Sequence, residues 1–229
     1  MVDQFSPGVA QRSDLWEVVA AELRQAIVTG TIAPEVHLQE SVLAQKFGVS
    51  KASIHEALFQ LEHEGLVRSE PRRGAFAVGL GGGAVQEIYD LRRLLEVEAG
   101  RLATPRASAP DLARLQSLVH QMAEAIGRED ARQLAELDIT FHREIFTIAG
   151  HRRIQSAWEP IAGIIATLLR LTDAFARNKQ VIIHTHQIVV DALAAGNPDA
   201  VERAIRQHLD AGVQTITEVL RDQLPRRGK

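Results

Sequence analysis

The chain has 229 residues, of which 45% are hydrophobic and 24% charged, and its formal net charge is −3. This composition is typical of a globular protein with a sizeable core, and an aromatic content of only 4% predicts that the core is mostly aliphatic. The chain has no cysteine, which excludes disulfides and thiolate metal sites. It also has no run near the roughly 18 apolar residues of a membrane span, so we expect a cytoplasmic protein with no membrane partner.

The N-terminal segment is predicted to contain a leader and one helix. Residues 1–12 show no hydrophobic periodicity and are expected to be flexible. Ser13 or Asp14 can cap a helix whose apolar residues recur at helical spacing. Gly30 is expected to end this helix.

The stretch 39–61 is predicted to form two short helices joined by a tight turn. Apolar residues recur at helical spacing on both sides of Gly48, a residue that tolerates the positive φ of a sharp turn. Ser50 can cap the second helix. This layout is that of a helix-turn-helix, whose second helix lies in the major groove of DNA.

A β-hairpin is predicted directly after these helices. Residues 66–70 and 75–78 are typical of short strands, and the turn between them is basic. A hairpin attached to a helix-turn-helix is a wing. We therefore expect a winged helix-turn-helix domain over residues 13–79, followed by a flexible glycine-rich linker at 80–84.

Helical patterns account for the rest of the chain. Glycine, proline and asparagine divide it into six amphipathic segments, at residues 84–104, 109–127, 130–149, 152–176, 179–195 and 198–223. Pro160 lies inside the fourth segment and is expected to kink or split it. The predicted fold is therefore mainly α, with an all-helical antiparallel bundle at 85–223 and a tail at 224–229.

Polar side chains on three of the predicted bundle helices point inward. Asp138 and His142 lie four residues apart on one helix face, and His186 and His208 each fall within an apolar stripe, whereas His184 is placed on an outward face. Buried polar groups need partners, and one carboxylate with three imidazoles can hold Zn²⁺, Ni²⁺, Co²⁺ or Mn²⁺. Hydrogen-bonded core histidines are the alternative that the pattern leaves open.

Arg92 is a further candidate for a binding residue. It shares a helix face with Tyr89 and Glu96. An inward guanidinium can bind a carboxylate through two parallel hydrogen bonds. A solvated arginine, or an ion pair with Glu96, explains the pattern equally well.

Taken together, the two halves of the chain resemble the GntR family of bacterial transcription regulators, in the FadR-like branch with an all-helical FCD effector domain. The resemblance extends from about Leu15 to Leu220. In the first half it is carried by Ile27-x-x-Gly30, Leu38-x-Glu40-x-x-Leu43-Ala44, Gly48-Val49-Ser50, Glu56-Ala57-Leu58, Leu61-Glu62-x-Glu64-Gly65-Leu66-Val67 and Arg73-Gly74. In the second half it is carried by Tyr89-x-x-Arg92-x-x-x-Glu96, Asp138-x-x-Phe141-His142, His186 and His208-Leu209.

The resemblance implies a role for each motif. The metal ligands of the family correspond here to Asp138, His142, His186 and His208, with zinc as the first choice of ion. Arg92 is implied to contact a small carboxylate effector. The residues implied to read DNA are Ser50, Lys51, Ser53, His55, Arg73 and Gly74. The implied protein is a homodimeric repressor that binds a pseudo-palindromic double-stranded DNA operator.

The chain departs from the family pattern where DNA is read. Lys51 and His55 stand where the family usually has arginine, so the bidentate fork of arginine is lost at both positions. Residues 1–80 hold seven Lys or Arg against ten Asp or Glu, although DNA-binding domains usually show a basic surface. Weak non-specific affinity or an altered operator explains this balance. Near the metal ligands, Thr185 replaces the usual Glu and Asn197 a frequent Asp.

Two other hypotheses use the same residues. A metalloenzyme fused to a binding module would activate water at the metal, but no general base or nucleophile is placed beside the four ligands. A purely structural metal would require no small-molecule ligand. The leading hypothesis remains a ligand-responsive regulator that is not an enzyme.

Overall fold

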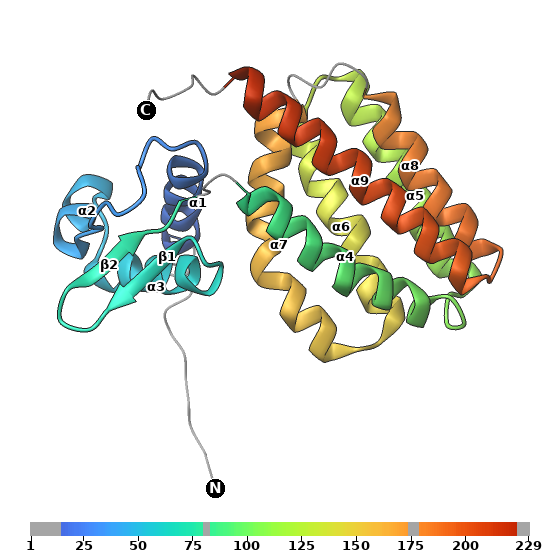
Figure 1. Ribbon diagram of the computed structural model, residues 1–229, viewed down its shortest axis with the longest axis horizontal. Helices are drawn as coiled ribbons and strands as arrows, with labels where there is room; N and C mark the ends of the chain where they lie inside the picture. Colours follow the sequence, from blue (N-terminus) through green and yellow to red (C-terminus); the bar gives the residue numbers. More distant parts are fainter. Residues whose placement is uncertain (1–14, 80–82, 174–178, 224–229) are drawn as a thin grey trace, which may run out of the picture. The chain divides into compact units, whose positions relative to one another are not determined.

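The structure is a computed structural model that describes residues 15–79, 83–173 and 179–223. Outside these residues lie the predicted leader 1–12, the predicted caps Ser13 and Asp14, linker residues 80–82, residues 174–176 of the fourth bundle segment and the tail 224–229. The described residues form nine helices and two strands, so the prediction of a mainly α fold is confirmed (Figure 1). Contacts divide the chain into two compact units, residues 1–80 and 81–229.

The N-terminal unit consists of three helices and a hairpin. These are α1 (Leu15–Val28), α2 (Glu40–Phe47), α3 (Lys51–His63), β1 (Val67–Glu70) and β2 (Gly74–Ala77). The two strands pair antiparallel, with Val67 opposite Ala77 and Glu70 opposite Gly74. Helix α3 packs against α1, α2 and β1. The predicted helix-turn-helix and wing are therefore both present.

Local chemistry explains the turn between α2 and α3. Gly48 ends α2 with a φ of 66°, in the left-handed region where a side chain would be strained. The side chain of Ser50 accepts a hydrogen bond from the backbone N–H of Ser53 at 3.1 Å and so caps α3. Beyond the turn, Ile54, Leu58 and Leu61 bury the inner face of α3.

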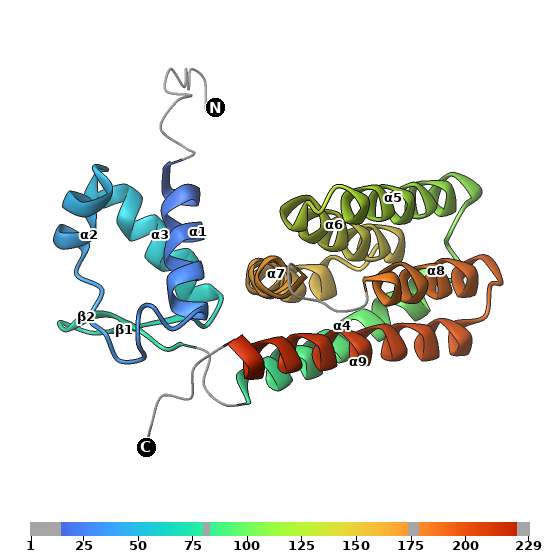
Figure 2. The ribbon, with the colours of Figure 1, turned by 90° about the horizontal axis from the view of Figure 1, so that it is seen from above.

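The C-terminal unit is a bundle of six helices. These are α4 (Ala84–Ala103), α5 (Ala109–Gly127), α6 (Ala131–Ala149), α7 (Arg152–Asp173), α8 (Gln180–Ala194) and α9 (Pro198–Gln223). Five of them close a ring of neighbours in the order α4, α9, α8, α5, α6 and back to α4, and α7 packs on α4, α6 and α9. Figure 2 shows α5 on one side of the bundle and α9 on the other. No described helix is long and apolar enough to cross a membrane.

The structure excludes one of the two effects expected of Pro160 in α7, the split, and not the kink. Pro160 does not split the segment, because α7 runs as a single helix through it, although its axis bends along its course (Figure 1). Trp158, Ile161 and Ile165 are buried on both sides of the proline. Packing of these side chains offsets the loss of one helical hydrogen bond at the proline.

Candidate functional site

The residues implied to read DNA at the start of α3 are grouped on one helix. Lys51 and His55 both have exposed side chains. Ser50 and Ser53 are occupied in capping, since their hydroxyl oxygens lie 3.0 Å apart in addition to the backbone hydrogen bond. Of these four side chains, those of Lys51 and His55 are exposed and take no part in the cap of α3.

A carboxylate from α2 holds His55. Its Nδ1 lies 2.9 Å from Oε1 of Glu40, the first residue of α2. The pair borders an open groove that is also lined by Lys51, Glu56 and Phe59. The groove thus places two carboxylates, those of Glu40 and Glu56, near Lys51 and His55.

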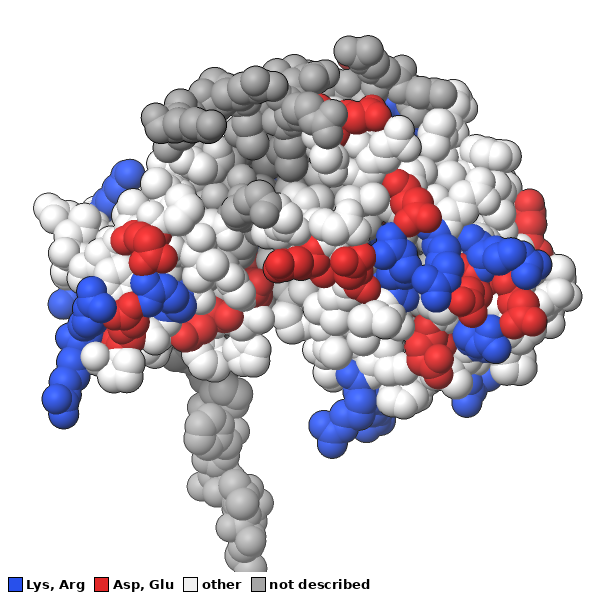
Figure 3. Space-filling view, viewed as in Figure 1, with Lys and Arg blue, Asp and Glu red and all other residues white. Residues whose placement is uncertain are grey.

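The tip of the wing contains Arg73 and Gly74. Gly74 has a φ of 92°, and a Cβ there would lie 2.7 Å from Nε2 of His37, so only glycine fits. Arg73 pairs with Glu70, and its guanidinium lies 5.3 Å from the centre of the Phe76 ring. Figure 3 shows basic and acidic side chains of this unit next to one another rather than one basic area.

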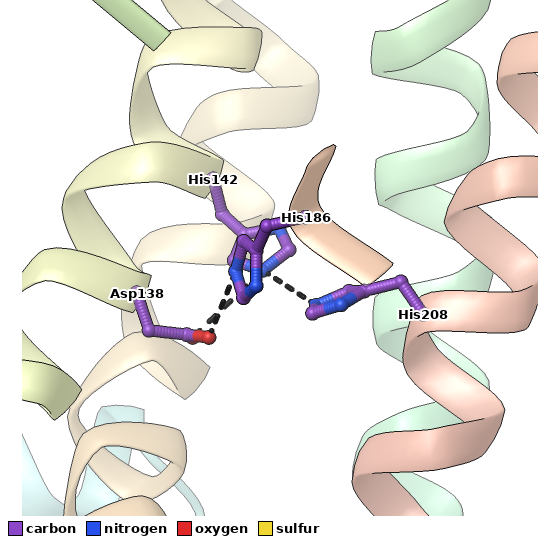
Figure 4. Close-up of side chains that lie close together, drawn as sticks. All are labelled: Asp138, His142, His186 and His208. Atoms are coloured by element: carbon purple, nitrogen blue, oxygen red, sulfur yellow. Dashed lines mark hydrogen bonds and ion pairs between the residues drawn. The ribbon is translucent and has the colours of Figure 1, made fainter. Parts of the chain in front are cut away.

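Four polar side chains meet inside the helical bundle (Figure 4). Asp138 and His142 come from α6, His186 from α8 and His208 from α9, and all four are buried. The oxygen and nitrogen atoms that could bind a metal lie within 4.8 Å of one another. His142 Nε2 is 3.1 Å from His208 Nε2, and His186 Nε2 is 3.2 Å from Asp138 Oδ1. His184, by contrast, is exposed as predicted.

The first two imidazoles have partners at Nδ1. His142 Nδ1 lies 2.8 Å from Oε2 of Glu96, and His186 Nδ1 lies 2.8 Å from the carbonyl oxygen of Ile182. Because a carboxylate and a carbonyl only accept, each Nδ1 carries the hydrogen. A ring with its one hydrogen on Nδ1 directs the lone pair of Nε2 to the centre of the cluster.

The third imidazole reaches the same state through a hydroxyl. His208 Nδ1 lies 3.1 Å from Oγ1 of Thr185. Thr185 donates its own hydrogen to the carbonyl oxygen of Val181 at 2.9 Å, so its oxygen accepts from His208. The Nε2 lone pair of His208 consequently faces inward as well.

The arrangement fits a metal ion. Two nitrogen lone pairs 3.1 Å apart repel each other unless a proton or a metal cation lies between them. Among the described residues, Asp138 Oδ2 and His186 Nε2 are buried without a hydrogen bond. Metal-ligating histidines usually donate their other ring N–H to a carboxylate, carbonyl or similar acceptor, as these three do. One carboxylate and three imidazoles suit a divalent transition metal.

The charges of the cluster favour ligand-competent protonation states. Burial opposes ionisation of Asp138, but the neighbouring His186, His142 and Arg92 outweigh it and lower its pKa to about 2. Burial is also the main reason why the pKa of His208 lies well below its ordinary value, and the neighbouring His186, His142 and Arg92 lower it further. An ionised aspartate and a neutral histidine are the forms that bind metals.

Arg92 lies beside the cluster and is only 1% exposed. Its Nε donates to Glu96 Oε1 at 2.7 Å, and Trp158 Nε1 donates to the same oxygen at 2.9 Å. Although burial opposes it, Arg92 and His142 hold the pKa of Glu96 below its ordinary value. The Nη2 of Arg92 has no hydrogen bond among the described residues. Arg92 is thus both inward and paired with Glu96, and the alternative of a solvated arginine is wrong.

A cavity of about 50 Å³ adjoins these groups. Its lining includes Tyr89, Arg92, Asp138, Thr185, His208 and Gly212. A Cβ on Gly212 would lie 3.1 Å from the hydroxyl of Tyr89, so the glycine keeps this end of the cavity open.

Three partner residues were not recognised from the sequence. Glu96 was considered only as a partner of Arg92, and Thr185 and Glu40 only as family motif positions. Thr185 precedes His186 on the same helix, about 100° around its axis, which could have indicated a contact with the neighbouring helix. The sequence holds no local signal that links Glu96 to α6.

A winged helix-turn-helix followed by a helical bundle defines a class of two-domain DNA-binding regulators. Residues 15–77 match the bacterial regulatory proteins of the gntR family, and residues 87–211 match the FCD domain. The chain belongs to the GntR family of transcription regulators and carries an FCD domain. Its domains are those of DNA-binding regulators and not of enzymes. Regulators of this family bind DNA operators and usually act as dimers.

Relatives cover most of the chain. The HTH-type transcriptional repressor RspR of Escherichia coli is 28% identical over 86% of this chain and 86% of its own. The gluconate operon transcriptional repressor of Bacillus licheniformis is 30% identical over 84% and 81%. A GntR family regulator from Pseudomonas syringae aligns at a TM-score of 0.54 with 29% identity, covering 92% of this chain and 87% of that chain. E. coli McbR/YncC shares the fold, with a TM-score of 0.70 and 21% identity over 89% and 97%.

Proposed function

We propose that this protein is a repressor whose operator binding is modulated by a small organic acid bound at a metal site in the helical bundle. In this proposal residues 13–79 bind DNA, residues 80–84 link the domains, and residues 85–223 bind the acid and mediate dimerisation. The observation that carries the proposal is a cavity lined by Asp138 and His208 of the four-residue cluster and by Arg92, whose Nη2 has no hydrogen bond among the described residues.

The metal is proposed to be held by the four clustered side chains. Zinc is the first choice because it accepts three imidazoles and one carboxylate, while nickel, cobalt and manganese fit the same donors. When bound, the ion supplies a Lewis-acidic centre that attracts a carboxylate. The 2.8 Å contact of Glu96 with His142 and the hydrogen bond between Thr185 and His208 orient these two rings toward it.

The effector is proposed to be a small carboxylate. Arg92 is fixed by Glu96 through Nε, which leaves Nη2 as a charged donor beside the cavity. A buried, charged donor without a partner is costly, and a carboxylate satisfies it. The relative that represses a gluconate operon makes gluconate one acid to test.

The DNA contacts are proposed to come from the first turns of α3 and from the wing tip. The residues assigned to them are Ser50, Lys51, Ser53, His55, Arg73 and Gly74. Two such units in a cytoplasmic homodimer would occupy the halves of a pseudo-palindromic operator.

Calorimetry with a panel of small carboxylates, gluconate included, tests the effector site. The zinc-loaded protein is expected to bind at least one acid, and the chelator-treated protein to bind it much more weakly. Arg92→Lys is expected to reduce affinity by about tenfold or more, because lysine lacks the planar fork. Arg93→Lys on the same helix is the matched control, since Arg93 pairs with Asp90 and Asp210 away from the cavity.

The same titration separates the proposal from a structural metal. If no acid of the panel binds while chelation unfolds the bundle, the metal is structural and the effector proposal fails. Equal loss of affinity in Arg92→Lys and Arg93→Lys would remove Arg92 from the site.

A further inference from the structure

Half of the Lys and Arg side chains described in the N-terminal unit are paired with its own glutamates. Arg24 pairs with Glu64, Arg68 with Glu35 and Glu70, and Arg73 with Glu70. Within residues 15–79, the side chains of Lys46, Lys51 and Arg72 make no hydrogen bond or ion pair. This unit has few Lys and Arg side chains, and internal pairing reduces the number that are available to contact DNA.

The pair between Glu40 and His55 lies on the surface proposed to face DNA. Glu40 is the first residue of α2, where the helix dipole favours a negative charge, and it reaches across to α3. The imidazole donates Nδ1–H to the carboxylate at 2.9 Å. The ring is therefore held in one orientation, with only Nε2 left for an external partner.

This geometry has different consequences for the two kinds of DNA contact. Non-specific binding comes from cations that neutralise phosphates, and a carboxylate next to such a cation opposes it. Base edges in the major groove are recognised by positioned hydrogen-bonding groups, and a fixed ring offers one. A carboxylate on His55 therefore weakens the first kind of contact while orienting the ring for the second.

We propose that Glu40 is a positioning residue for His55 that raises the discrimination between operator and non-operator DNA by suppressing non-specific binding. The inference rests on the proposed DNA-binding function. The wing supports it, because Arg73 is paired with Glu70 in the same manner. Among Lys51, His55 and Arg73, only Lys51 has no acidic partner in the part of the chain that the structure describes.

The variant Glu40→Gln tests this role with two duplexes of equal length and base composition. One is selected from random sequence by the wild-type protein, and the other is its scrambled form. Affinity for the scrambled duplex is expected to rise about three- to tenfold, because loss of one exposed ion pair changes a binding constant severalfold per subunit. Affinity for the selected duplex is expected to rise less. The dependence of log K on log salt is expected to steepen by about 0.9 for each protonated His55 that reaches a phosphate.

Glu56→Gln is the matched control. Glu56 lines the same groove and is exposed, but its side chain makes no hydrogen bond or ion pair in the described chain. The variant Glu56→Gln removes the same charge from the same surface but breaks no ion pair. Its effect on the two duplexes is expected to be smaller and nearly equal.

A double-mutant cycle with His55→Gln identifies the route of action. In the His55→Gln background, Glu40→Gln is expected to change the ratio of the two affinities no more than Glu56→Gln does. The inference is overturned if Glu40→Gln and Glu56→Gln behave alike, or if the effect of Glu40→Gln persists without His55. If the wild-type protein selects no sequence and binds no duplex, the proposed function fails instead.

Discussion

The three inward histidines are set to one tautomer by three different acceptors: a carboxylate, a backbone carbonyl and a threonine hydroxyl. The hydroxyl is the weakest of these acceptors, and it works only because Thr185 donates its own hydrogen to the helix backbone. The strength of the proposed metal site therefore depends on a side chain that is not itself a proposed ligand.

Thr185→Val is expected to weaken zinc binding by about 10- to 100-fold, because His208 loses the acceptor that fixes its ring. Competition with a chromophoric chelator measures this affinity. Thr185→Ser keeps the hydroxyl and is expected to bind zinc within a few-fold of wild type. Equal affinities of the valine and serine variants would show that the hydroxyl does not support the site.

The pKa of His208 predicts how the stability of the metal-free bundle depends on pH. Its folded pKa lies below the ordinary value of 6.5, so below about pH 6.5 the unfolded chain binds a proton that the folded chain does not. Stability is therefore full above pH 6.5 and falls as the pH decreases from there toward the folded pKa. The lowered pKa of Asp138 adds a further loss between 3.8 and about 2.

Urea unfolding of the chelator-treated protein at pH 7.5 and 5.5 measures this dependence. The signal is the fluorescence of buried Trp158, recorded in a Trp16→Phe background. The urea midpoint is expected to be lower at pH 5.5. In His208→Gln this loss is expected to be smaller. A midpoint that is higher at pH 5.5 would contradict the assigned direction of the pKa shift.

At the residue scale, periodicity predicted which side chains point inward but not what they contact. His186 and His208 were assigned from the apolar neighbours on their own helices, and such neighbours are a local signal. Glu96 reaches His142, and Glu40 reaches His55, only because separate helices pack together. Contacts of this kind depend on tertiary geometry that no spacing in the sequence encodes.

At the scale of elements, helices α4 and α9 are held close by a glycine. A Cβ on Gly100 would lie 2.4 Å from Cδ1 of Ile205 and 2.8 Å from Cγ1 of Val201. These helices carry Arg92 and His208, so their spacing positions two groups of the candidate site.

Gly100→Ala is expected to destabilise the bundle by about 1–3 kcal/mol, because the added methyl group forces two buried side chains or the helix axes to move. Gly127→Ala at the end of α5 is the control, since a Cβ there meets nothing within 4 Å. That variant is expected to be neutral or slightly stabilising. Denaturant unfolding compares the two, and a neutral Gly100→Ala would disprove the close approach of α4 and α9.

Element boundaries were the most predictable feature of the fold. The six bundle helices start and end close to the predicted residues because their ends are marked by local chemistry, such as the Ser108 capping box of α5 and Gly150 after α6. At Pro160 only the alternative of a split helix was wrong, and the reason is not local. Its local effect is disruptive, but buried neighbours on both sides keep α7 continuous.

At the scale of the whole molecule, regulation requires that the acid bind the DNA-competent and DNA-free states with different affinities. Typical coupling free energies of about 1–3 kcal/mol correspond to a 5- to 150-fold change in operator affinity. The same coupling is reciprocal, so operator DNA must weaken binding of the acid by the same factor.

The most direct test is a titration of operator affinity, by fluorescence anisotropy, with an acid identified by calorimetry, using zinc-loaded and chelator-treated protein in parallel. For the zinc-loaded repressor, saturating acid is expected to weaken operator binding at least fivefold, while the chelator-treated protein shows little response. An operator affinity that is unchanged by the acid, or that changes equally with and without zinc, would contradict control of DNA binding through the metal site.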